Sequence, residues 1–61
     1  MLFDLVKKYD SLEDFEKVLV DNLIQDQYNK ISVMRYLFYR LNLCIADARD
    51  LYFFLEKRGT G

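Results

Sequence analysis

Residues 31–41 read Ile-Ser-Val-Met-Arg-Tyr-Leu-Phe-Tyr-Arg-Leu, and a helix formed by them carries apolar or aromatic side chains on almost every side. Such a helix is either covered by neighbours over most of its surface or presents an apolar face to a partner. Asn29 is a favourable N-cap residue before it, and Asn42 suits the left-handed position that ends many helices. We therefore predict a helix over residues 30–41.

Two further helices are predicted on either side of this one. Ser11 and Asp14 form a variant of the capping box, which indicates a helix over residues 11–25. Its apolar residues at helical spacing predict a core stripe of Leu12, Phe15, Val18, Leu19 and Leu23. After a turn at Leu43 and Cys44, a third helix is predicted over residues 45–57. Its core stripe is expected to be Ile45, Ala48, Leu51, Tyr52 and Leu55.

The chain is predicted to be one all-α domain, residues 1–61, built as a three-helix bundle. The second and third helices form a tight hairpin, and residues 2–9 form a short helical or extended lead-in. The sequence has no proline, and its two glycines stand at positions 59 and 61, so few residues break helices. An apolar fraction of 52% with 31% charged residues is typical of a folded chain.

The small size of the chain points to association. A domain of about 60 residues buries only about 60% of its unfolded surface, and disulfides, metals or oligomerisation usually add the missing stability. The single cysteine, Cys44, cannot form an intrachain disulfide, and without histidine no Cys/His zinc site can form. We therefore expect no metal and no cofactor, and a homo-oligomer, with a dimer as the favoured state.

The charges are divided unevenly between the two halves, although the formal net charge is only −1. Residues 1–28 carry three lysines and seven acidic residues, a balance of −4, and residues 29–61 carry six cations and three acidic residues, a balance of +3. Two interpretations stay open. The halves attract each other within the fold or across a dimer, or the basic half meets an acidic partner.

The sequence predicts a cytoplasmic protein without a membrane partner. No apolar run approaches the roughly 20 residues of a membrane-spanning helix. The first residues, Met-Leu-Phe-Asp-Leu-Val-Lys-Lys, lack the order of charged and apolar segments found in a signal peptide. A free thiol without a disulfide is typical of a reducing compartment.

No catalytic site is predicted. Without histidine, acid–base catalysis would need a carboxylate or lysine with a perturbed pKa, and no cluster of residues indicates one. Asp47 and Asp50 are interpreted as the solvated first turn of a helix and not as a metal pair. Cys44 lies at a helix start, where the helix dipole lowers a thiol pKa. A redox or small enzymatic role is an alternative that rests on Cys44 alone.

Apolar residues outside the core stripes indicate a contact surface. On the second helix, Val33, Leu37 and Leu41 are expected to be core, which leaves an adjoining apolar sector. Elsewhere Val20, Ile24 and Phe53 fall outside their stripes. Three short helices cannot each be covered on two sides, so we expect burial between subunits, anchored by aromatic and Arg side chains. The predicted partner-binding residues are Ile31, Met34, Arg35, Phe38, Tyr39 and Phe53.

We therefore predict a small non-enzymatic protein–protein interaction module that self-associates and acts as a regulator or inhibitor of a larger cytosolic machine. The alternative is a nucleic-acid-associated helix–turn–helix regulator that uses its basic half. That alternative would use Arg35, Tyr36, Tyr39, Arg40 and Arg49. The third helix, which would be the recognition helix, has few cations, and this disfavours the alternative.

Part of the chain resembles known families. Asn29-Lys-Ile-Ser-Val-Met-Arg35, followed by Leu41-Asn-Leu-Cys-Ile-Ala-Asp-Ala-Arg-Asp-Leu51, resembles the helix–turn–helix of the bacterial ribosomal stalk protein's C-terminal domain. That family has Asn-Lys-Val-Ala-Val-Ile-Lys, then a helix, then Gly-Leu-Gly-Leu and finally Lys-Glu-Ala-Lys-Asp-Leu. The same stretch is similar to the ClpS-like protease-adaptor fold, including the basic-Gly pair Arg58-Gly59.

This resemblance, over residues 29–58, implies a helical hairpin whose first helix presents an apolar and basic face. The factor-binding face of the stalk family maps to Lys30, Ile31, Met34, Arg35 and Phe38. The chain departs from both families because it has no predicted strand, whereas they are α/β folds. Asn42 and Cys44 stand where the family has turn glycines, and Glu56 stands at the adaptor's pocket histidine. Binding of translation factors or degrons is therefore not carried over.

Overall fold

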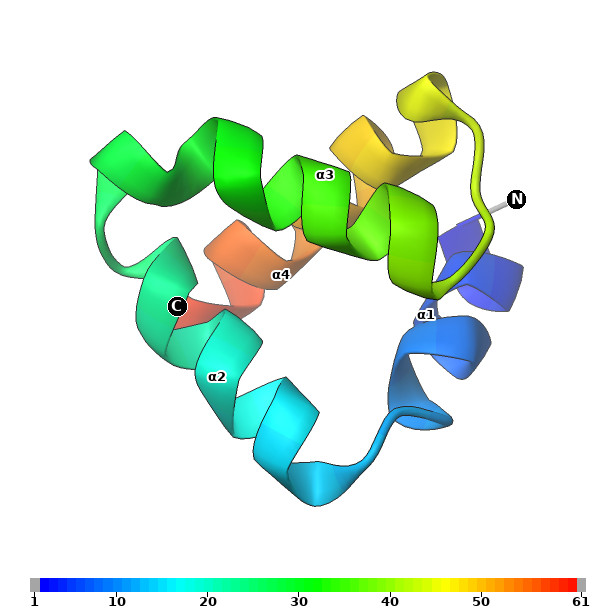
Figure 1. Cartoon of the computed structure of the whole chain (residues 1–61), viewed down its shortest axis with the longest axis horizontal. Coiled ribbons are helices and arrows are strands. Elements are labelled where there is room, and N and C mark those ends of the chain that lie inside the picture. Colours follow the sequence, from blue (N-terminus) through cyan, green and yellow to red (C-terminus); the bar gives the residue numbers. More distant parts are fainter. Residues whose placement is uncertain (1, 61) are drawn as a thin grey trace.

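The computed structural model describes residues 2–60, and all regular elements among them are helical (Figure 1). The α-helices are α1 (Leu2–Asp10), α2 (Asp14–Ile24), α3 (Lys30–Arg40) and α4 (Ile45–Thr60), and a 3-10 turn, η1, spans Gln27–Asn29. The all-α class is confirmed. The prediction of three helices was wrong, because the described residues form four α-helices. The ends of the predicted domain, residues 1 and 61, lie outside the described residues.

Helix α1 replaces the predicted lead-in and contributes to the core. Leu5 and Tyr9 are one turn apart on the same face of α1, and both are buried. A nine-residue helix is too short to be stable in isolation, so this packing supplies most of its stability. The sequence left residues 2–9 undecided because the stabilising contacts lie far away in the chain.

Helix α4 is the centre of the packing, since it contacts α1, α2 and α3. In Figure 1 it passes behind α3. Four of the five residues in its predicted core stripe are buried, namely Ala48, Leu51, Tyr52 and Leu55. The fifth, Ile45, was predicted wrongly and is 76% exposed. It is the first residue of α4, where no neighbouring helix covers its side chain.

The buried face of α2 differs from the predicted one. Val20 and Ile24, which were expected outside the stripe, are buried. Among the predicted core residues, Leu12 is buried just before the helix and Leu23 is half-buried. The other three are exposed, by 69% for Phe15, 58% for Val18 and 46% for Leu19. The inward face follows positions 16, 20 and 24, and the charged side chain of Glu16 hides this spacing in the sequence.

The predicted cap of α2 was also wrong. The N-cap residue is Glu13, and the Ser11 hydroxyl donates a hydrogen bond backwards to the Lys8 carbonyl at the end of α1. Asn29 does precede α3, but its side chain makes no capping hydrogen bond. Its backbone amide instead donates to the Asp26 carbonyl, at 2.9 Å, because η1 leads directly into α3.

The turn between α3 and α4 has the expected form. Asn42 adopts a left-handed conformation with φ 54°, which confirms its predicted role. The Leu43 amide donates to the Phe38 carbonyl at 3.1 Å, the six-to-one hydrogen bond that commonly ends a helix. Val33 and Leu37 of α3 are fully buried as predicted, while Leu41 is half-buried against the core.

Two valines of α2 test its orientation. Val20→Ala removes buried methyl groups and should lower the free energy of unfolding by about 1–3 kcal/mol. The matched variant Val18→Ala removes the same atoms from an exposed site and should change stability by less than about 0.5 kcal/mol. Urea unfolding followed by circular dichroism measures both. A larger loss for Val18→Ala than for Val20→Ala would contradict this orientation of α2.

Candidate functional site

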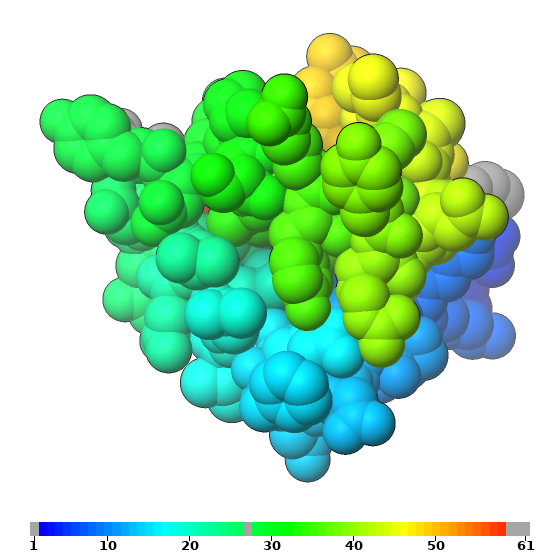
Figure 2. All heavy atoms as spheres, in the orientation of Figure 1, coloured from blue at the N-terminus to red at the C-terminus, as the bar shows by residue number. Residues whose placement is uncertain are grey.

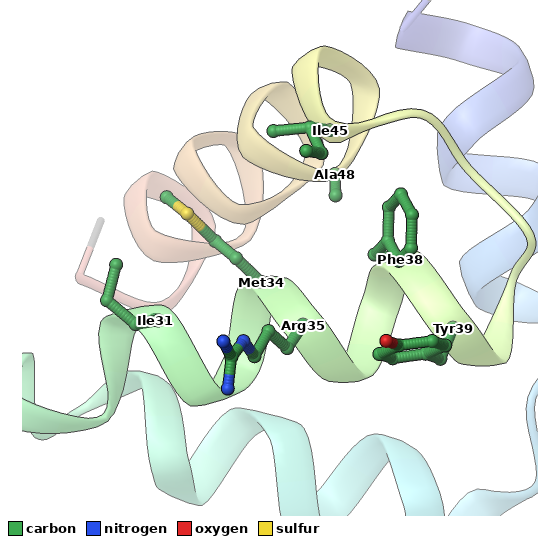
Figure 3. Close-up of a pocket in the computed structure, with 7 residues that line it drawn as sticks. All are labelled: Ile31, Met34, Arg35, Phe38, Tyr39, Ile45 and Ala48. Carbon is green, nitrogen blue, oxygen red and sulfur yellow. The ribbon is translucent and has the colours of Figure 1, made fainter.

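A shallow groove lies between α3 and the start of α4 (Figure 3). Its volume is about 300 Å³. One wall is formed by Ile31, Met34, Arg35, Phe38 and Tyr39 of α3. Ile45 and Ala48 of α4 form the other wall, and we call this set of seven residues the α3–α4 groove. The lining is predominantly apolar, with Arg35 as its charged member.

Helix periodicity explains how α3 builds this groove. Val33 and Leu37 face the core, so the residues that follow them, Met34 and Phe38, lie at the edge of the buried face and are half-buried. In Figure 3 the side chains of Met34 and Phe38 extend from α3 towards α4. Ala48 is small and buried on the facing helix, so a hollow remains above it.

The structure brings together five of the six residues predicted to bind a partner. Phe53 is the exception. It lies further along α4, where the Lys30 ammonium stands 4.8 Å from its ring centroid. It lines a separate hollow, shared with Leu2 and Asp50 among others. The sector of Ile31, Met34 and Phe38 is therefore neither closed core nor fully open surface, and no residue of α2 lines the groove.

Glu16 forms a buried polar contact that the sequence did not reveal. Its carboxylate accepts hydrogen bonds from the Tyr36 hydroxyl at 2.8 Å and from Arg40 Nε and Nη2 at 2.8 and 3.1 Å. These bonds, first from Arg40 and then from Tyr36, hold the pKa of Glu16 below its ordinary value. Burial and the bond to Glu16 raise the pKa of the Tyr36 hydroxyl. The contact joins the acidic half of the chain to its basic half.

This contact changes the predicted nucleic-acid surface. Four of its five residues, Arg35, Tyr36, Tyr39 and Arg40, line one hollow of about 430 Å³ together with Ser32. The fifth, Arg49, lies on α4 and does not line it. The charge of Arg40 is already balanced by Glu16 in an ion pair of 2.8 Å. The hollow therefore has less positive charge to offer a phosphate than the sequence indicates.

Tyr9 forms a second polar contact between distant parts of the chain. Its hydroxyl lies 3.1 Å from Asp21 Oδ1 and 3.2 Å from the Lys17 carbonyl oxygen, which ties α1 to α2. The Arg58 guanidinium of α4 stands 5.7 Å from the centroid of its ring. Burial, followed by the Asp21 carboxylate, raises the pKa of Tyr9 well above its ordinary value. Within the described residues, every buried side-chain nitrogen and oxygen has a hydrogen-bond partner.

Cys44 and the carboxylates of the chain are the other candidates for a functional site. Cys44 is an exposed free thiol in the α3–α4 turn. The described part of the chain contains no group of three His, Cys, Asp or Glu side chains that is able to hold a metal ion. Over the same residues, no helix combines the length and apolar character needed to cross a bilayer.

Comparisons with known proteins give no relative for this chain. No family model, no curated protein and no solved structure matches it. The resemblance of residues 29–58 to the stalk and adaptor families is therefore neither supported nor opposed by a match and stays a prediction. The interpretation of the α3–α4 groove as a functional site is therefore based on its geometry alone.

The Glu16 contact predicts a pH dependence of stability. Because the folded-state pKa of Glu16 is depressed, its contribution is complete above the unfolded value of about 4.3 and is lost as the pH falls through the folded-state value. We expect Glu16→Gln to be less stable than wild type at pH 7, and this difference to vanish in acid. Urea midpoints between pH 7 and pH 2 measure the effect.

The matched control for this experiment is Glu13→Gln, which neutralises an exposed glutamate at the start of the same helix. Its midpoints should follow those of wild type across the pH range. If Glu13→Gln lost as much stability at pH 7 as Glu16→Gln, the effect would come from the general charge of α2 and not from the Glu16 contact.

Proposed function

We propose that this protein is a non-enzymatic protein-interaction module whose contact surface is the α3–α4 groove, and that it self-associates as a dimer. The observation that carries the proposal is the convergence of Ile31, Met34, Arg35, Phe38 and Tyr39 on one groove. The aromatic, methionine and arginine side chains among them belong to the types enriched at protein interfaces. The volume, about 300 Å³, lies at the lower limit of small-molecule pockets and suits a few side chains of a partner.

The exposed apolar surface supports the same proposal. Ile31, Tyr39 and Ile45 are 64%, 78% and 76% exposed at the groove. A cluster of this kind is costly to leave in water, and association removes that cost. We further propose that the protein works in the cytoplasm without catalysis, as a regulator or inhibitor of a larger assembly. That step rests on its size and class.

Ile31→Lys tests the groove as the contact surface. It places a charge on an exposed groove position, so the fold should survive while the dimer dissociation constant rises by about 30-fold. Phe3→Lys is the control, because Phe3 is 70% exposed on α1 and lies outside the groove. Sedimentation velocity over low to high micromolar concentrations measures both. A wild-type monomer throughout, or a dimer unchanged by Ile31→Lys, would refute the proposal.

A nucleic-acid function is the second candidate, favoured by the shared hollow of Arg35, Tyr36, Tyr39 and Arg40. Salt separates the two functions, because binding to phosphates weakens steeply as salt rises and an apolar contact does not. At 150 mM salt, we expect a fluorescent DNA duplex not to bind the wild-type protein, so that Arg35→Ala has no binding to remove. Micromolar binding that Arg35→Ala removes and that Ile31→Lys strengthens would favour the nucleic-acid function instead.

A further inference from the structure

We infer that the surface received by the α3–α4 groove is the outer face of α2 on a second copy of this chain. This inference rests on the proposed function and specifies its partner. The outer face of α2 carries the three exposed apolar residues Phe15, Val18 and Leu19, which we call the α2 stripe. The contact is proposed to be reciprocal, so that each copy inserts its α2 stripe into the groove of the other.

The α2 stripe has the spacing of a helix that binds in a groove. Phe15, Val18 and Leu19 stand at positions i, i+3 and i+4, so they lie on one side of α2 and form a single ridge. From Phe15 to Leu19 the ridge rises about 6 Å along the helix axis. The groove follows α3 from Ile31 to Tyr39, a length of about 12 Å. The ridge is therefore short enough to lie within the groove.

The charges beside the two surfaces are complementary. Helix α3 carries Lys30, Arg35 and Arg40 without any acidic residue. Arg40 is used by Glu16 within the chain, whereas Arg35 forms no ion pair among the described residues. Along α2 and its N-cap, the exposed acidic side chains of Glu13, Asp14 and Asp21 outnumber the single Lys17. Helix α2 is thus net acidic and helix α3 net basic, so α2 of one copy attracts α3 of the other, whereas two grooves facing each other would bring their Arg35 side chains together.

The arrangement of the helices permits both contacts at once. Helices α2 and α3 pack side by side, and Figure 2 shows their side chains covering most of one face of the molecule. In the proposed pair, a second copy set against this face contacts the α2 stripe and the α3 wall of the groove together. A standard interface takes about 800 Å² from each partner, about a sixth of the 4525 Å² surface of this chain. A twofold pair of this kind closes on itself, whereas a one-way contact would extend into a filament.

Complementation between two variants tests the inference. Phe15→Lys damages only the ridge, and Ile31→Lys damages only the groove. We expect each variant alone to be folded by circular dichroism and at least 30-fold weaker than wild type in dimerisation. Mixed in equal amounts, the two should pair again, because one intact ridge then meets one intact groove. Sedimentation velocity with a fluorescent label on one variant measures this pairing. Phe3→Lys, at a position as exposed as Phe15, should dimerise as wild type does.

The outcomes separate this inference from the proposed function. If Ile31→Lys abolished the dimer while Phe15→Lys left it intact, the groove would remain the contact surface and the α2 stripe would be excluded as its occupant. A mixture that stays monomeric, although wild type dimerises, would also overturn the inference. If Phe15→Lys abolished the dimer and Ile31→Lys did not, the groove itself would be excluded, and the proposed function would fail with it.

Discussion

The structure depends on the burial of one face of α4 by the other three helices. Leu51 and Tyr52 are fully buried, and α1, α2 and α3 each contact α4. A 61-residue chain has little core to divide, so four short helices are stable only if they share one. This constraint explains why α1 forms although it has only nine residues, and why α2 turns Val20 and Ile24 inwards.

The same constraint places a charged group against the core. Glu16 lies on the inward face of α2, and its carboxylate would be costly to bury without partners. Tyr36 and Arg40 of α3 satisfy it with three hydrogen bonds. Because Arg40 is paired with Glu16, the remaining positive charge of α3 is carried by Lys30 and Arg35. An interaction that stabilises the fold therefore also limits what the basic half of the chain can bind.

A shared core leaves apolar surfaces outside it. Each short helix is covered on one side only, and the α2 stripe and the α3–α4 groove are among the apolar surfaces that remain uncovered. The groove residues of α3 could be predicted from the sequence because their periodicity is local and visible. The contribution of Ile45 and Ala48 could not, since it depends on how α4 crosses α3. The α2 stripe was taken for core, because apolar residues at helical spacing do not show which side of a helix faces inwards.

Local signals were sufficient for the all-α class, for the turn at Asn42, and for α3 and the core stripe of α4 apart from Ile45. They act through neighbouring residues, by capping, spacing and the absence of helix breakers. The existence of α1, the inward face of α2 and the role of Glu16 follow from contacts between residues 8 to 24 positions apart. Such contacts have no local pattern, because their free energy is gained only when the helices pack together.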